Sequence, residues 1–462
     1  MLEEIIKNRA VRLKAIKEKG INPYPAEAKR TIKIAEGVKN FNKFLASKKK
    51  FFVVGRLRSW RDQGNLIFTD LEDASGKIQL ILKKNLTRGF PFFKSVLDVG
   101  DFVEVSGKFF KTKRGEKSLE VSSIKILTKS LRPLPTEWYG LKDVEDRYRH
   151  RYLDFILNSA SKDKIILRSK TVEELRKILW QEGFSEVETP ILQPLPGGAL
   201  AKPFKTFYNA LDEDFYLRVA PELYLKRLLV GGFEKIFEIG KDFRNEGVDR
   251  SHNPEFTMLE LYWAYADYKQ LMKFTKSVIL KLLNSLKLKK TLIYQGQKIN
   301  FGGNWKIYTF DGVLREFIGA KANNLNNQEV DEVFKKEVRG KLINPTFIIN
   351  HPKAISPLAK ANEKDSDLVD RFQLVVGGFE LVNAFSELND PIDQRERMEE
   401  QEKMYRAGDE EASRLDEDFL EALEYGMPPT AGLGMGIDRL AAILTDSHNI
   451  KEIIPFPTLR SK

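Results

Sequence analysis

The sequence contains no cysteine, which excludes disulfide bonds, thiolate metal sites and a cysteine nucleophile. Its four histidines (His150, His252, His351 and His448) lie too far apart in sequence to form a His-rich zinc motif. No apolar run approaches the length of a membrane-spanning helix, and the opening segment MLEEIIKNRAVRLKAIKEKG lacks the apolar core of a secretory signal. These absences predict a cytoplasmic protein without a membrane partner.

Positive charge is in excess, with a formal net charge of +11 and a pI near 9.3. Such an excess favours a polyanionic partner and fast, salt-sensitive association. Lysine-rich proteomes also give basic enzymes of every kind, so the charge alone leaves nucleic-acid binding and an ordinary basic enzyme both open. With 462 residues, 42% of them hydrophobic, the chain is long enough for two or three domains.

Residues 1–130 are predicted to form an N-terminal helix and a small barrel of the OB type. Apolar residues recur at helical spacing over 2–19, and Gly20 ends that pattern. Five strand-like segments follow between 51 and 127: FFVVGRL, NLIFTDL, KIQLILK, DFVEVSGKFF and SLEVSSIKIL. A barrel without any ligand is the alternative. The prolines of LRPLPTEWYG then predict a linker over 131–150.

Residues 151–462 are predicted to form an α+β domain. Apolar positions recur at helical spacing from Ser161 until Gly183. Strand-like segments such as KIFEIGKDFR and RFQLVVGGFELVNAF follow, with helices interspersed, which favours a mainly antiparallel sheet flanked by helices. A small insertion is expected around 285–345, partly helical over 326–340. No P-loop is present, because GLGMGIDR lacks the required lysine and spacing.

The segment KDFRNEGVDRSHNPEFTMLELYWAYADY, residues 241–268, concentrates charged and aromatic side chains. Arg244 and Glu246 are expected to alternate on one strand, and Phe256, Glu260 and Tyr262 to share one face of the next. Two acids and an arginine on one face of a hairpin either meet a ligand or form a buried network that only ties the sheet together.

Three further segments add polar groups that together would line a pocket. In GLGMGIDRLAAIL, Arg439 opens a helix after small glycines, which suits a phosphate, although a helix-packing motif is the alternative. In GGFELVNAFSELND, Asn383, Phe385 and Glu387 share one face of a strand. In VAPELYLKRL, Glu222 directly follows a proline. The last two segments, taken alone, are also compatible with an ordinary surface.

In this order, the segments resemble the signatures of class II aminoacyl-tRNA synthetases, and of the lysyl-tRNA synthetase family (subclass IIb) in particular. FRNEG…HNPEFTMLELY is similar to motif 2, GLGMGIDR to motif 3, and the helix ending in GFSEVETPIL to motif 1. LRPLPTEWYGL, RYRHRYLD, GGALAKPF, APELYLKRL and FSELND are similar to the lysine-specific segments between those motifs. The resemblance covers essentially the whole chain.

The resemblance implies that lysine is activated with ATP to lysyl-adenylate and then esterified to the 3′ end of tRNA(Lys), without a protein nucleophile. Catalysis of this kind is orientation and charge stabilisation of the reacting phosphate. Arg244 is the implied catalytic residue, bridging the lysine carboxylate and the α-phosphate. The implied ATP-binding residues are Arg244, Glu246, His252, Phe256 and Arg439.

Lysine carries two ammonium groups, so its pocket needs carboxylates at both ends. The resemblance assigns Glu222 and the backbone near Gly198 to the α-amino end, and Glu387 with Tyr262 to the side-chain end. The rest of the implied pocket is Glu260, Asn383, Phe385 and Gly434. An unpaired buried charge costs about 3–5 kcal/mol, so a neutral side chain facing Glu387 is expected to be rejected. Charge alone does not separate lysine from arginine or ornithine.

In the N-terminal domain, Phe68, Gln79 and Glu116 match the family positions that read the central uridine of the anticodon, with Arg61 supporting the backbone. An aromatic platform with an amide and a carboxylate is a plausible reader of single-stranded RNA. The alternative is that Phe68 belongs to the barrel core. The resemblance also implies a homodimer formed through motif 1.

Two departures from the family pattern concern ATP. Family members place two acids around a magnesium ion; Glu380 matches the second, but Gln373 stands at the first and loses a charge that Mg²⁺ favours. We therefore expect this metal site to be altered. The motif 2 loop has Ser251 where the family has arginine, and Arg250, one place earlier, is a candidate to replace it.

Three other functions remain open from the sequence. An aspartyl- or asparaginyl-type synthetase is disfavoured by Glu222 and Glu387, which would repel an acidic side chain. A relative that attaches lysine to a protein would lack the anticodon domain. A non-catalytic RNA-binding protein on a decayed synthetase frame is supported only by Gln373 and Ser251.

Overall fold

The computed structural model describes residues 2–135, 141, 143–247, 249–319 and 327–460. The chain forms two compact units, Met1–Leu141 and Lys142–Lys462. This boundary falls inside the predicted linker 131–150, of which residues 136–140 and 142 lie outside the described residues. Among the residues that the structure describes, no helix is long and apolar enough to cross a membrane.

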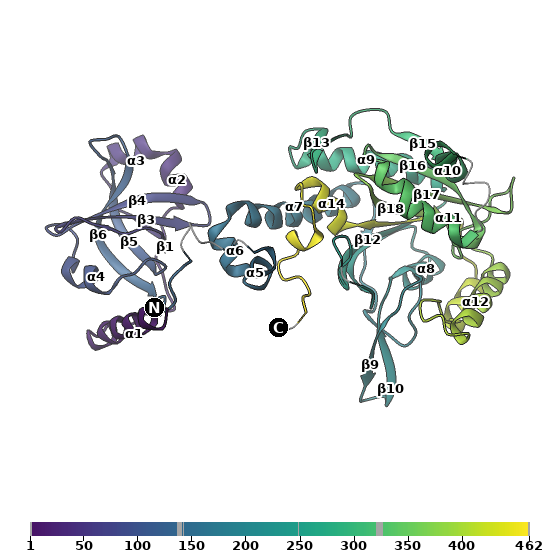
Figure 1. The fold of residues 1–462 in the computed structure, drawn as a ribbon, viewed down its shortest axis with the longest axis horizontal. Coiled ribbons are helices and arrows are strands. Elements are labelled where there is room, and N and C mark those ends of the chain that lie inside the picture. The colour runs from purple at the N-terminus through teal and green to yellow at the C-terminus, as the bar shows by residue number, and fades with distance from the viewer. Residues whose placement is uncertain (1, 136–140, 142, 248, 320–326, 461–462) are drawn as a thin grey trace. The chain divides into compact units, whose positions relative to one another are not determined.

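The first unit is a barrel with short helices around it (Figure 1). Its strand order is β1-β5-β6-β4-β3-β2, and a further pairing between β1 and β3 closes the barrel. All five predicted strands are present, with a two-residue strand, β2, added to them. The elements are α1 (Leu2–Glu18), α2 (Ile34–Lys39), α3 (Phe41–Ser47), β1 (Phe51–Leu57), β2 (Arg61–Asp62), β3 (Leu66–Asp73), β4 (Gly76–Lys83), α4 (Phe90–Val96), β5 (Phe102–Lys111) and β6 (Lys117–Thr128).

Alternation along β3 decides which of its side chains face the barrel core. Ile67 and Leu71 are fully buried inside the barrel. Because successive side chains of a strand point to opposite faces, Phe68 lies on the other face and is only half-buried. The alternative in which Phe68 belongs to the barrel core is therefore wrong.

The second unit is built on an eight-stranded sheet with the order β15-β16-β17-β18-β19-β12-β11-β7. Its pairings are antiparallel except β15–β16 and β11–β7, which confirms the mainly antiparallel sheet predicted from the sequence. The strands of this sheet are β7 (Ser185–Glu186), β11 (Lys235–Phe243), β12 (Glu255–Ala264), β15 (Lys306–Thr309), β16 (Thr346–Pro352), β17 (Leu368–Val376), β18 (Phe379–Ser386) and β19 (Thr430–Gly436).

Helices and smaller strands surround that sheet. The helices are α5 (Val144–Arg149), α6 (Arg151–Leu157), α7 (Ser159–Gln181), α8 (Glu222–Val230), α9 (Tyr268–Ser285), α10 (Phe310–Ile318), α11 (Asn327–Val333), α12 (Pro391–Arg406), α13 (Glu417–Glu424) and α14 (Ile437–Leu444). A three-stranded sheet holds β8 (Leu192–Gln193), β9 (Phe204–Tyr208) and β10 (Glu213–Leu217), and β13 (Thr291–Tyr294) pairs with β14 (Gln297–Asn300). The range predicted as an insertion, 285–345, holds β13 to α11 and a π-helical turn over 334–338, but its strand β15 belongs to the main sheet, and its residues 320–326 lie outside the described residues.

The main core lies between one face of the sheet and helices α7, α9 and α14. Fully buried Leu175 and Leu179 of α7 and Leu271 of α9 pack in one cluster with Leu259 of β12 and Leu433 of β19. Since neighbouring side chains on a strand point to opposite faces, the residues between these apolar ones turn away from the core. That second face of β12 and β19 carries the pocket described below.

One local prediction is wrong. Arg244 and Glu246 do not share a strand, because β11 ends at Phe243. The amide of Asn245 donates to the carbonyl of Lys202 (2.7 Å) instead of to β12, so the chain leaves the ladder there. The two side chains are positioned by a loop rather than by strand alternation.

Candidate active site

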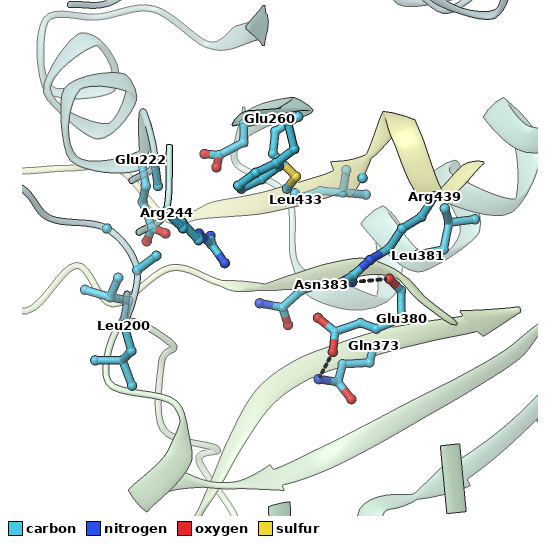
Figure 2. Close-up of a pocket in the computed structure, with 18 of the residues that line it drawn as sticks. Leu200, Glu222, Arg244, Glu260, Gln373, Glu380, Leu381, Asn383, Leu433 and Arg439 are labelled. Carbon is cyan, nitrogen blue, oxygen red and sulfur yellow. Dashed lines mark hydrogen bonds between the residues drawn. The ribbon is translucent and has the colours of Figure 1, made fainter. Parts of the chain in front are cut away.

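A cavity of about 410 Å³ opens above β12, β18 and β19 in the second unit. Apart from Arg250, every residue predicted to bind lysine, ATP or magnesium lines it (Figure 2). These residues are Gly198, Glu222, Arg244, Glu246, His252, Phe256, Glu260, Tyr262, Gln373, Glu380, Asn383, Phe385, Glu387, Gly434 and Arg439. The structure therefore brings together positions that lie up to 241 residues apart, from Gly198 to Arg439.

Strand register explains how β12 and β18 present side chains to the same space. Glu260 and Asn383 both pair with Gly434 of β19, and Tyr262 and Phe385 both pair with Gly432. Glycines at these two positions of β19, between strands that carry side chains there, leave room for a pocket floor. The alternation predicted for Glu260 and Tyr262, and for Asn383 and Phe385, is confirmed.

Gly432 is a residue that the sequence argument did not single out. A Cβ atom at this position would lie 2.0 Å from Glu387 Oε1 and 2.6 Å from Tyr262 Cε1. Only glycine therefore fits between these two side chains. The repeated glycines of GLGMG, at 432, 434 and 436, are the signal that could have identified it.

Buried acidic groups form one end of the cavity. Glu387 is 1% exposed, and Tyr262 donates a hydrogen bond to Glu260 Oε2 (3.1 Å). Burial, with the nearby Asp242 and Glu222, raises the pKa of Glu260 well above its usual value. Burial also raises the pKa of Glu387, which the neighbouring ammonium of Lys226 opposes. Because removing carboxylates from water is unfavourable, this end of the cavity favours a cationic ligand group that compensates their charge.

Two arginines and an aromatic ring also line the cavity. The guanidinium of Arg244 lies 5.2 Å from the ring centroid of Phe256. Arg439 donates to the carbonyl oxygen of Glu380 (2.8 Å), and its second Nη lies 3.3 Å from His252 Nε2. Figure 2 shows Arg244 and Arg439 entering the cavity from opposite sides. Two guanidinium groups beside an aromatic face suit an anion attached to a flat ring.

Two comparisons with known proteins agree with this geometry. Residues 143–460 match the family described as tRNA synthetases class II (D, K and N), and residues 51–127 match the OB-fold nucleic acid binding domain. The chain is 45% identical to a lysine–tRNA ligase of Carboxydothermus hydrogenoformans over 100% of this chain and 99% of the relative. It is 48% identical to that of Aquifex aeolicus over 88% of this chain and 72% of the relative. The chain belongs to the lysine–tRNA ligase family.

Family membership confirms the resemblance and the fold class predicted from the sequence. The structure adds a supporting residue to the family pocket. Arg371 of β17 donates to Asn383 Oδ1 (2.8 Å) and to Ser356 Oγ (2.8 Å), so it fixes the amide of Asn383. Arg371 stands two residues before Gln373 on β17, so strand alternation could have identified it as facing the same side.

Arg250 does not line the cavity. Its guanidinium lies 2.7 Å from His448 Nε2, while the Asp249 carboxylate accepts from the backbone amides of Ser251 and His252. Burial opposes the shift, but hydrogen bonds from His252 and Ser251 lower the pKa of Asp249 to about 2. Arg250 would reach ATP only if this loop moved, and its role in ATP binding stays a prediction.

Gln373 and Glu380 are the residues predicted to hold magnesium. Gln373 Nε2 donates to Glu380 Oε2 (3.0 Å), so the amide presents a donor to the carboxylate (Figure 2). Within the described part of the chain, no group of three or more His, Cys, Asp or Glu residues could hold a metal. Because Mg²⁺ demands a near-octahedral set of oxygens, these residues do not fit a site made of protein ligands alone.

The predicted anticodon residues lie on the barrel of the first unit. Arg61 of β2 pairs with Phe68 of β3, and its guanidinium lies 6.0 Å from the Phe68 ring centroid. Gln79 of β4 pairs with Ser118 of β6, whose hydroxyl donates to Gln79 Oε1 (3.0 Å). Glu116 is exposed in the turn before β6. The four lie on or beside strands β2, β3, β4 and β6, which are consecutive in the sheet.

Proposed function

We propose that this chain is a lysine–tRNA ligase that activates L-lysine with ATP and transfers the lysyl group to the 3′ end of tRNA(Lys). The observation that carries the proposal is the set of charges gathered in one cavity. Buried carboxylates of Glu222, Glu260 and Glu387 line it together with the guanidinium groups of Arg244, which lies beside Glu222, and of Arg439, which enters from the opposite side.

These charges would orient the amino acid. An ammonium group at Glu387 and a second at Glu222 place the lysine carboxylate toward Arg244. An acidic or neutral side chain would leave Glu387 buried without a cation, at a cost of about 3–5 kcal/mol. Gly198, whose backbone lies against Glu222 and has a left-handed conformation (φ +88°), would complete the α-amino end.

In the first step, a carboxylate oxygen of lysine attacks the α-phosphorus of ATP. The new bond is the mixed anhydride of lysyl-adenylate, and the bond from the α-phosphorus to the bridging oxygen of pyrophosphate breaks. Arg244, between the carboxylate and the α-phosphate, would neutralise the charge that develops on the phosphate oxygens. Phe256 and Arg439 would hold adenine, Glu246 would read its edge, and His252 would contact the terminal phosphates.

In the second step, a hydroxyl of the terminal ribose of tRNA attacks the lysyl carbonyl carbon, and AMP leaves. Phe68 would stack on the central uridine of the anticodon, with Gln79 and Glu116 reading its edge and Arg61 supporting the backbone. Base stacking on an aromatic ring is worth about 1–3 kcal/mol.

Magnesium would be held chiefly by the phosphates of ATP, since Mg²⁺ is commonly bound by one or two carboxylates together with substrate phosphates. Glu380 is the carboxylate available for it. Gln373 reduces the negative charge at this place, so we propose a greater dependence on the concentration of free Mg²⁺ than two acids would give.

A homodimer is also proposed. The small sheet of β8, β9 and β10 and the turn between β9 and β10 carry apolar side chains that are about half exposed in the single chain, namely Leu192, Phe207, Tyr208 and Leu211. Exposed apolar groups gathered in one region commonly mark protein interfaces. A role in translation would place the enzyme in the cytoplasm.

The test is amino-acid-dependent exchange between ATP and pyrophosphate, measured with each standard amino acid while Mg²⁺ is titrated, followed by charging of tRNA(Lys). Exchange with lysine alone is expected. Exchange with aspartate or asparagine would refute the reading of the carboxylates. No exchange at any Mg²⁺ concentration, together with retained tRNA binding, would favour a non-catalytic RNA-binding protein.

A further inference from the structure

Lys226 is buried directly behind the wall of the cavity. Its side chain is 0% exposed, and its Nζ lies 2.7 Å from Glu222 Oε1 and 2.5 Å from Glu387 Oε2. Glu222 stands one helical turn earlier on α8, while Glu387 comes directly after β18. Both carboxylates line the cavity and Lys226 does not. Its ammonium therefore joins the two acids from outside the space left for a substrate.

One ammonium shared by two buried carboxylates has a clear electrostatic consequence. Burial and the nearby Glu222 carboxylate both raise the pKa of Glu387, and the Lys226 ammonium opposes this rise. A protonated carboxyl group no longer provides the charge that binds an ammonium group. The cation thus favours the form of Glu387 that can bind a cationic substrate.

We propose that Lys226 is a positioning residue that holds Glu222 and Glu387 as a charged pair, and so fixes the preference of the pocket for an amino acid with two ammonium groups. The inference rests on the proposed function. Lys226 touches neither lysine nor ATP, and acts only through the two carboxylates.

The surroundings of Glu387 leave this role to Lys226. On β12, Tyr262 donates its hydroxyl hydrogen to Glu260 rather than to Glu387. On α8, the next cation, Arg227, turns away to Asp416 (2.8 Å). The backbone of Glu387 is fixed independently, because its amide donates to the carbonyl of Thr430 (2.8 Å). Loss of the Lys226 charge would therefore alter the carboxylate while its backbone anchor remains.

The test compares Lys226→Met with Lys336→Met in lysine-dependent exchange between ATP and pyrophosphate. Lys336 pairs with Glu332 at the same four-residue spacing but on an exposed surface (3.0 Å). Lys226→Met is expected to raise the KM for lysine roughly ten- to a hundredfold at pH 7, with the KM for ATP nearly unchanged. The increase should shrink as the pH rises, because the Glu387 carboxyl, whose pKa burial raises, ionises again at higher pH. Lys336→Met should match the wild type.

Lys226→Arg, which keeps the charge, should recover most of the lysine affinity. A lysine KM that Lys226→Met leaves unchanged, or one that rises equally for ATP and lysine at every pH, would overturn the inference. Failure of wild-type exchange with lysine would instead refute the proposed function, so the two failures are distinguishable.

A measurement on the wild type does not depend on the folding of any variant. Calorimetric titration of lysine at pH 7, in buffers of different ionisation enthalpy, counts the protons released on binding. If Lys226 outweighs the burial that raises the pKa of Glu387, and keeps that carboxylate ionised in the empty pocket, proton release should be close to zero. Release of close to one proton per site would show that a carboxyl group is protonated there, and would overturn the inference.

Discussion

Gly432→Ala is a small change that should damage lysine recognition selectively. The added Cβ would lie 2.0 Å from Glu387 Oε1, whereas real Cβ contacts are essentially never shorter than 3.0 Å, so the carboxylate must move by at least 3.0 − 2.0 = 1.0 Å. The ring of Tyr262 would have to move as well, since its Cε1 atom would lie at 2.6 Å. Both groups belong to the end of the cavity that would bind the substrate side chain.

A displacement of about 1 Å at a recognition group costs on the order of a hundredfold in rate. That factor corresponds to about 2.7 kcal/mol of lost transition-state stabilisation. We expect kcat/KM for lysine in the exchange reaction to fall about a hundredfold. The KM for ATP should change little, because the atoms nearest the added Cβ belong to Glu387 and Tyr262 and not to Arg244, Phe256 or Arg439.

The matched control is Gly340→Ala, since a Cβ at Gly340 would meet nothing within 4 Å. This variant should retain wild-type kinetics. Thermal unfolding of both variants separates a local effect from loss of the fold. If Gly432→Ala kept the wild-type kcat/KM for lysine, Glu387 and Tyr262 could not be the groups that fix the substrate, and the pocket assignment would be refuted.

Other changes test the remaining parts of the molecule. Arg244→Lys keeps a charge but loses the guanidinium fork, so kcat of exchange should fall on the order of a hundredfold; an unchanged kcat would contradict its catalytic role. Phe68→Ala should weaken tRNA(Lys) charging by about 1–3 kcal/mol of lost stacking and leave exchange unchanged; equal losses in both assays would contradict an anticodon role. Gln373→Glu should lower the Mg²⁺ concentration for half-maximal exchange, and an unaltered Mg²⁺ titration would show that position 373 does not influence the metal.

The sequence predicted the parts of the pocket that depend on strand periodicity. The residues of β12 and β18 that face the cavity were correct, because alternation needs only the direction of a strand. The prediction from alternation was wrong where the backbone leaves the hydrogen-bonded strand pair. Arg244 and Glu246 were assigned to one strand, yet β11 ends at Phe243 and the loop to β12 positions both of them.

Residues that act across the fold were harder to predict. Lys226 is four residues from Glu222, so their pairing on one helical face could have been inferred, but its contact with Glu387 joins α8 to the end of β18, 161 residues away. The need for glycine at 432 likewise depends on side chains from two neighbouring strands. Sequence spacing does not predict such contacts between distant residues until the order of the strands in the sheet is known.

The position of Lys226 also bears on why a cation-binding pocket can be this deeply buried. Removing carboxylates from water costs several kcal/mol per ion. If the substrate were the only source of cations, the carboxylates of the empty pocket would be poorly ordered or protonated. A permanent ammonium behind the wall offsets part of this cost before lysine arrives. Glu387 Oε1, which Lys226 does not contact, lies beside Gly432 and accepts no hydrogen bond from the described residues. Selectivity for lysine would then come from carboxylates that are already ionised and fixed, rather than from groups that must reorganise on binding.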